Sequence, residues 1–141
     1  MNESGAGALT VEVLATLHAL STRLEEALEP LGLSLAKFGL LSKLVAAGEP
    51  LPLSTLAERQ ACVRSNITQL VDRLESEGLV RRADDPHDRR SIRAELTAEG
   101  RARHAAGRRV LEKAERDAFA PIAPARRQQL LEMLQALRGV R

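Results

Sequence analysis

Apolar side chains recur at every third or fourth position over most of the chain, the spacing that places them on one face of a helix. The first such stretch covers residues 9–28 and stops before Pro30 and Gly32. A second stretch follows Ser34, a residue type that caps helix N-termini, and ends at Gly48. The pattern therefore predicts two helices near the start of the chain.

Two shorter apolar patterns come next, separated by a break near Ala61. The first follows Pro52, and the second ends at Gly78. Their apolar residues are Leu53, Leu56 and Ala57 in the first pattern, and Ile67, Leu70, Val71 and Leu74 in the second. Two short helices joined by a tight break predict a helix-turn-helix.

Beyond Gly78 the spacing changes from helical to alternating. Ile92, Ala94 and Leu96 alternate with polar residues, as in a strand with one buried face, and an Asp-Pro pair upstream is typical of a turn. This segment predicts a two-stranded β-wing with a charged tip.

Two further helices are predicted at the C-terminal end. Thr97 caps a long helix that runs toward Pro121, and Pro124 starts a final one. The apolar stripe of the final helix consists of Leu130, Met133, Leu134 and Leu137. This stripe and that of residues 9–28 exceed what a compact helix-turn-helix core can cover, so we expect a second subunit to cover them.

The composition agrees with a mainly α fold, because 24 Leu and 22 Ala dominate a chain of 141 residues that has no Trp and no Tyr. The scarcity of sheet-forming residues excludes a β-sandwich, and the length fits one domain. The formal net charge is only +2, but 18 of the 21 basic residues are Arg, whose planar guanidinium suits phosphate and guanine. The position of the arginines therefore matters more than the net charge.

The sequence offers no chemistry for a cofactor, a metal or an enzyme. His18, His87 and His104 are isolated from the partners that zinc needs, and no phosphate loop or nucleophile elbow is present. A single cysteine excludes an intrachain disulfide and fits a reducing compartment. Because the N-terminus has no basic start and no apolar run approaches membrane length, we expect a cytoplasmic protein without a membrane partner.

The segment from Leu53 to Leu96 resembles the winged helix-turn-helix of the MarR family of bacterial regulators. The matching motifs are Leu56-Ala57-Glu58, the helix residues 66–75, Gly78-Leu79-Val80, Asp88-Arg89-Arg90 and Leu96-Thr97-Ala98-Glu99-Gly100. The chain departs from the family in the turn, where Ala61 and Val63 replace the usual Gly and Ser or Thr. The resemblance implies a transcriptional regulator, expected to be a repressor, that binds pseudo-palindromic operators in double-stranded DNA as a homodimer.

The expected organisation follows from these patterns together with the resemblance. The ranges are a disordered N-terminus (1–8), an N-terminal dimerisation helix (9–33), a winged helix-turn-helix region (34–97) with its recognition helix at about 63–77 and its wing at about 79–97, and C-terminal dimerisation helices (98–141).

The recognition helix presents short polar and basic groups on the face opposite its apolar residues, and such groups reach base edges and phosphates. The expected DNA contacts on this helix are Arg64, Ser65, Asn66, Thr68, Gln69 and Arg73. At the tip of the wing, the resemblance implies that the carboxylate of Asp88 braces Arg89 or Arg90. It also implies that the tip enters a minor groove, where arginine favours narrow A·T-rich DNA.

The resemblance further implies a small organic anion as an effector, and we expect His18 and Phe38 to line its pocket. Two alternatives stay open. A thiol-redox switch would use Cys62, activated by Arg59 and Arg64, although a small buried thiol is the favoured interpretation. A helical protein-interaction module would dimerise without DNA, and it would not need the arginine tip.

Overall fold

The computed structural model describes residues 7–60 and 64–139, and these form a mainly α chain with one small sheet, as predicted. The elements in chain order are α1 (Ala8–Leu28), the short 3-10 helix η2 (Glu29–Leu31), α2 (Leu35–Ala47), β1 (Leu51–Pro52), α3 (Leu53–Arg59), α4 (Arg64–Ser76), β2 (Val80–Asp85), β3 (Asp88–Leu96), α5 (Ala98–Phe119) and α6 (Pro124–Leu137). Most of the expected disordered start, residues 1–6, lies outside the described residues.

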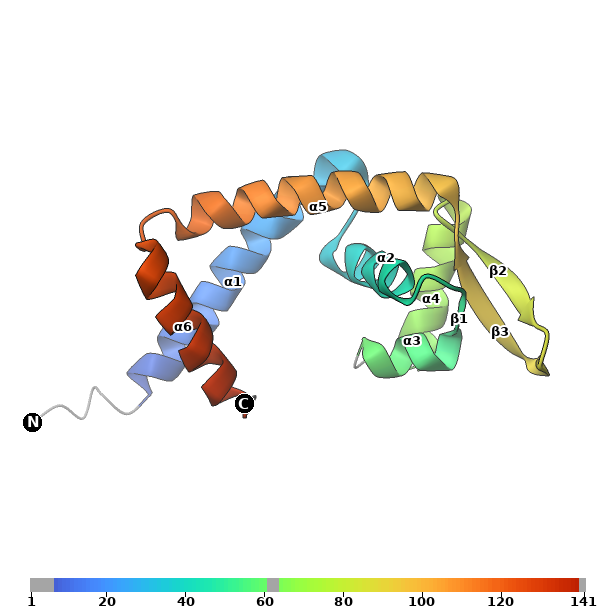
Figure 1. The fold of residues 1–141 in the computed structure, drawn as a ribbon, viewed down its shortest axis with the longest axis horizontal. Helices are drawn as coiled ribbons and strands as arrows, with labels where there is room; N and C mark the ends of the chain where they lie inside the picture. Colours follow the sequence, from blue (N-terminus) through green and yellow to red (C-terminus); the bar gives the residue numbers. More distant parts are fainter. Residues whose placement is uncertain (1–6, 61–63, 140–141) are drawn as a thin grey trace, which may run out of the picture.

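Helix α5 runs along the length of the molecule and joins its two ends (Figure 1). Helices α1 and α6 lie at one end, while α2, α3, α4 and the sheet lie at the other, and α5 contacts both α1 and α2. No single described helix is long and apolar enough to span a membrane, although Ala8–Leu31 and Leu35–Ala47 reach that length and composition together, across a 75° bend.

Local capping sets the helix ends where the sequence predicts them. The Ser34 hydroxyl accepts a hydrogen bond from the backbone N–H of Lys37 at 3.1 Å, which satisfies a donor at the start of α2. Gly48 follows the same helix with φ 68°, a left-handed conformation that glycine adopts without strain. These ends depend only on neighbouring residues, which is why the sequence alone locates them.

The sheet has the order β1-β3-β2, with antiparallel pairing throughout. The sequence predicts only the two strands of the ribbon. The third strand, β1, has two residues, Leu51 opposite Ala94 and Pro52 opposite Arg93. A strand this short, with a proline at the sheet edge, has no alternating pattern from which it could be predicted.

The buried core lies under α5, between α2, α3, α4 and one face of the sheet. Its fully buried large side chains are Leu28, Leu40, Leu41, Leu56, Ile67, Leu74, Leu79, Val71 and Val80. Along β3 the burial falls from Ala94, which is buried, to Ile92, which is 45% exposed. The ribbon therefore leaves the core before it reaches its tip.

Helix α5 approaches the start of β2 closely, and Gly100 makes this approach possible. A Cβ at this position would lie 2.0 Å from the carbonyl oxygen of Leu79 and 2.9 Å from a methyl carbon of Leu96. Since backbone cannot move aside as a flexible side chain can, the helix and strand must separate to admit any side chain.

We therefore expect Gly100→Ala to lower the free energy of unfolding by about 2 kcal/mol or more, through overpacking against backbone. Gly39→Ala is the matched control, because Gly39 is also helical but its added Cβ would meet only the end of the Gln60 side chain, at 3.1 Å. That change should stay within about 1 kcal/mol of wild type. Urea unfolding of the three proteins measures both, and equal stabilities would contradict the close approach.

Candidate nucleic-acid interface

Helix α4 separates its apolar and polar residues onto opposite faces. Ile67, Val71 and Leu74 are fully buried, whereas the predicted contacts Asn66, Gln69 and Arg73 are exposed; Arg73 lies in the last turn. The side chains of Arg64 and Ser65, which begin the helix, lie outside the described residues. The exposed surface thus carries amides and a guanidinium, the groups that bind base edges and phosphates, and it also carries the carboxylates of Asp72 and Glu75.

Thr68 lies on the flank of α4 that faces the wing. It precedes Asp72 by four residues and Glu75 by seven, so the three share one side of the helix. Its backbone carbonyl accepts a hydrogen bond from Arg82 of β2 at 3.5 Å. The structure therefore places Thr68 on the side of α4 next to the wing, and the residue is exposed.

The tip of the wing exposes Asp88, Arg89 and Arg90 together. The register of the ribbon shifts here, because Asp84 lies opposite Ile92 whereas Asp85 lies opposite Asp88. The two arginines therefore lie in the irregular part of β3, outside the regular ladder.

The partner of Asp88 differs from the one that the resemblance implies. Its carboxylate accepts a hydrogen bond from the backbone N–H of Arg90 at 3.0 Å. Within the described part of the chain it forms no ion pair with either arginine of the tip. Asp88 thus orders the backbone that carries the arginines, a short-range bond typical of aspartate in turns, and leaves both guanidinium groups to face solvent.

Arg82 is a residue of this interface that the sequence analysis missed. Its guanidinium forms ion pairs with Asp72 at 2.5 Å and with Glu75 at 3.0 Å, both on α4. Its backbone N–H also donates to Glu75, at 2.8 Å. Partial burial alone would lower the pKa of Arg82, but its hydrogen bonds and ion pairs with Asp72 and Glu75 outweigh that effect and raise it.

A signal for this contact exists in the sequence. Strand alternation from the buried Val80 places Arg82 on the same inward face, and Asp72 and Glu75 are three positions apart on one flank of the helix. An arginine on an inward strand face needs an acidic partner, because a buried charge without one is costly. The pairing could have been predicted only once the strand and helix were known to be adjacent.

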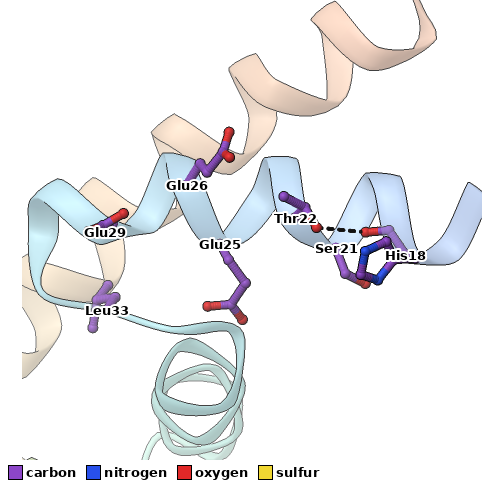
Figure 2. A pocket seen from close by; sticks show the side chains of 7 residues that line it. All are labelled: His18, Ser21, Thr22, Glu25, Glu26, Glu29 and Leu33. Atoms are coloured by element: carbon purple, nitrogen blue, oxygen red, sulfur yellow. Dashed lines mark hydrogen bonds between the residues drawn. The ribbon is translucent and has the colours of Figure 1, made fainter.

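His18 lines an open hollow of about 470 Å³ along α1 (Figure 2). Glu25, Glu26 and Glu29 line the same hollow, and Glu25 points toward α2, where it accepts a hydrogen bond from the backbone N–H of Leu35 at 2.9 Å. Three carboxylates near one histidine repel an anion, so the electrostatics of this hollow do not favour the expected effector.

Phe38 lines a different hollow, of about 240 Å³, between α1, α2 and α5. Arg108 lies at this hollow but pairs with Glu112 at 3.0 Å, and Glu115 adds a further carboxylate. The structure thus does not bring His18 and Phe38 into one pocket. Neither hollow carries an excess of positive charge, and the anionic effector stays a prediction.

The thiol of the redox alternative, Cys62, lies outside the described residues, as do Ala61 and Val63 of the turn. Among residues 7–60 and 64–139, no group of three or more His, Cys, Asp or Glu side chains is placed to hold a metal ion.

A helix-turn-helix followed by an arginine-tipped ribbon defines a winged helix-turn-helix protein. The model of the MarR family matches residues 33–92. The uncharacterised HTH-type transcriptional regulator YhbI of Bacillus subtilis is 34% identical over 105 residues, which are 71% of this chain and 68% of that protein. The chain belongs to the MarR family.

Two further comparisons agree with this membership. The HTH-type transcriptional repressor YetL of Bacillus subtilis is 36% identical over 99 residues, or 67% of this chain and 59% of that protein. Sco3205, a MarR family transcriptional regulator from Streptomyces coelicolor solved in complex with DNA, has a TM-score of 0.86 and 27% identity, and the match covers 98% of this chain and 88% of that one. The chain spans between 44% and 68% of the lengths of the curated relatives it matches.

His104, where α5 packs on α2, gives the stability of the fold a testable pH dependence. Its ring stacks on Phe38 with centroids 4.8 Å apart, and its Nε2 lies 3.0 Å from the Ser42 hydroxyl. Burial, and next the positive charge of Arg108, lower the pKa of His104 below its ordinary value of 6.5. The unfolded chain therefore takes up a proton at a higher pH than the folded chain does.

We expect the contribution of His104 to stability to be complete above pH 6.5 and to be lost as the pH falls below that value toward the lowered pKa of the folded state. His104→Gln should reduce this loss, as measured by urea unfolding between about pH 7.5 and 5.5. His87→Gln, at the exposed turn of the wing, controls for the removal of a histidine. If both variants keep the full pH dependence of wild type, other groups cause it.

Proposed function

We propose that this chain is a transcriptional repressor that binds a pseudo-palindromic operator in double-stranded DNA, with α4 in the major groove and the wing tip in the adjacent minor groove. The expected contacts remain Arg64, Ser65, Asn66, Thr68, Gln69, Arg73, Asp88, Arg89 and Arg90. The relatives named as repressors and the structure solved with DNA support this proposal.

The observation that carries the proposal is the distribution of charge around α4. Asp72 and Glu75 are turned toward Arg82, and Glu77, just after the helix, pairs with Lys37 of α2 at 2.5 Å. Each of these carboxylates is therefore paired with a cation of the protein, and Asp72 and Glu75 share the single guanidinium of Arg82. Asn66, Gln69 and Arg73 give the exposed surface of α4 amides that can form hydrogen bonds and a guanidinium that is attracted to a polyanion.

The homodimer is part of the proposal. Helices α1 and α6 expose large apolar side chains, with Leu9 79% and Leu137 71% accessible. Apolar surface of this kind on a small protein marks an interaction site, and two DNA-binding units read a pseudo-palindrome when a two-fold axis relates them. Ranges 9–33 and 98–141 then form the dimer and 34–97 binds DNA, in a cytoplasmic protein without enzymatic activity.

Truncation of individual contacts should separate base recognition from phosphate binding. Gln69→Ala should cost about 1–3 kcal/mol on the operator and little on other DNA, because base-edge contacts supply discrimination. Arg73→Ala should weaken all sequences alike and lower the salt dependence by about one unit, as expected of a phosphate contact. Arg90→Ala should lose most affinity on operators with A·T-rich flanks. Titrations of an operator, selected from random duplexes, and of a scrambled duplex at several salt concentrations measure all three.

Arg109→Ala is the control for loss of positive charge, because Arg109 is exposed on α5, about three turns beyond the end of that helix that follows the wing. Its DNA affinity should match that of wild type. If Arg73→Ala, Arg90→Ala and Arg109→Ala bind alike, binding reflects overall charge and the assignment of α4 and the wing is wrong.

The dimer should appear in light scattering as a mass of about twice 15.3 kDa at micromolar concentration. Met133→Glu places a charge in the exposed apolar stripe of α6 and should shift the protein toward monomer, with a matching loss of operator affinity. Gln128→Glu adds the same charge at a polar position of α6, where the side chain bonds Glu132, and should shift the dimer less than Met133→Glu does. A folded wild-type monomer at that concentration would contradict the proposed homodimer.

A further inference from the structure

Arg82 attaches the wing to α4 through polar contacts. On the inward face of the ribbon, Val80 is buried in the core, Arg82 is next, and Asp84 beyond it is exposed. Arg82 therefore stands where the ribbon leaves the core, with a side chain that is 25% exposed. The turn of the wing begins about 10 Å further along the strand, so a small rotation at Arg82 becomes a larger displacement of the tip.

The attachment holds both the backbone and the side chain of Arg82 in β2. One oxygen of Glu75 accepts the backbone N–H of Arg82 at 2.8 Å, and the other accepts Nη1 at 3.0 Å. Asp72 receives Nη2. Because β2 is an edge strand, an outward N–H has no strand partner, and Glu75 supplies one. Attachment at both points restrains rotation of the strand as well as its separation from the helix.

We propose that Arg82 is a positioning residue for DNA recognition: with Asp72 and Glu75 it fixes the wing relative to α4, so that the helix and the tip arginines meet DNA as one rigid body. This inference rests on the proposed DNA-binding function. Without the attachment, the tip must be ordered when it binds, and the entropy lost at that moment weakens the contribution of the wing.

Two sets of variants separate positioning from charge. Arg82→Ala removes one positive charge, whereas the double variant Asp72→Asn, Glu75→Gln removes two negative charges and keeps Arg82. Their direct effects on the attraction for DNA are opposite, but both break the attachment. Arg81→Ala is the matched control, because Arg81 is the neighbouring arginine of β2, its side chain is 66% exposed, and it pairs with Glu95 of the wing itself.

Each protein is titrated with two duplexes built on the sequence that wild type selects from a random library. One duplex contains the flanks that the wing contacts, and the other has scrambled flanks. The readout is the ratio of the two affinities, because a general loss of folding lowers both alike. Thermal unfolding followed by circular dichroism reports folding separately.

We expect wild type and Arg81→Ala to prefer the intact flanks, and both attachment-breaking variants to lose this preference by roughly tenfold. The double variant carries the test if Arg82→Ala fails to fold. Retention of the wild-type preference by a folded attachment-breaking variant would overturn the positioning role, while a wild type that selects no sequence would instead overturn the proposed function.

Discussion

The joint between α4, the wing and α5 is the constraint on which the arrangement of the molecule depends. The Thr97 hydroxyl donates to the carbonyls of Gly78 and Leu79 at 2.7 and 3.0 Å, and accepts from the N–H of Gly100 at 2.9 Å. The same Leu79 carbonyl faces the bare Cα of Gly100. One threonine and one glycine thus bring together the end of α4, both strands of the wing and the start of the helix that runs to the other end of the molecule.

The carboxylates on and just after α4 are paired with cations of neighbouring elements around this joint. Asp72 and Glu75 bind Arg82, while Glu77 binds Lys37, which also donates to the Gly32 carbonyl. Single ion pairs at a protein surface contribute little to stability. Their effect here is on geometry and on electrostatics, because the pairs join α4 and the residue just after it to neighbouring elements, and their two cations offset part of the negative charge of the three carboxylates.

The distribution of apolar surface divides the chain in a complementary way. The buried leucines gather at the end that holds α2, α3, α4 and the sheet, whereas large apolar residues in the first half of α1 and in α6 are exposed. Helix α5 carries buried positions such as Gly107 against Phe38 and extends from there to the exposed end. A single protomer therefore has a complete core at one end only, which is the physical basis for assigning the other end to a second copy.

The sequence by itself determined the features that rest on local interactions. The helix ends at Ser34, Gly48 and Thr97 depend on hydrogen bonds to residues three or four positions away, or on the freedom of glycine, and these were predicted at the observed residues. The buried face of α4 follows from the spacing of its apolar residues, and the family follows from the motifs that span the helix and the wing.

Only the tertiary structure decided the contacts between segments distant in sequence. It pairs Leu51 and Pro52 with β3, joins Arg82 to α4, and places His18 and Phe38 in separate hollows. A linear pattern reports which face of an element a residue occupies, but the partner on that face depends on how the elements pack in space.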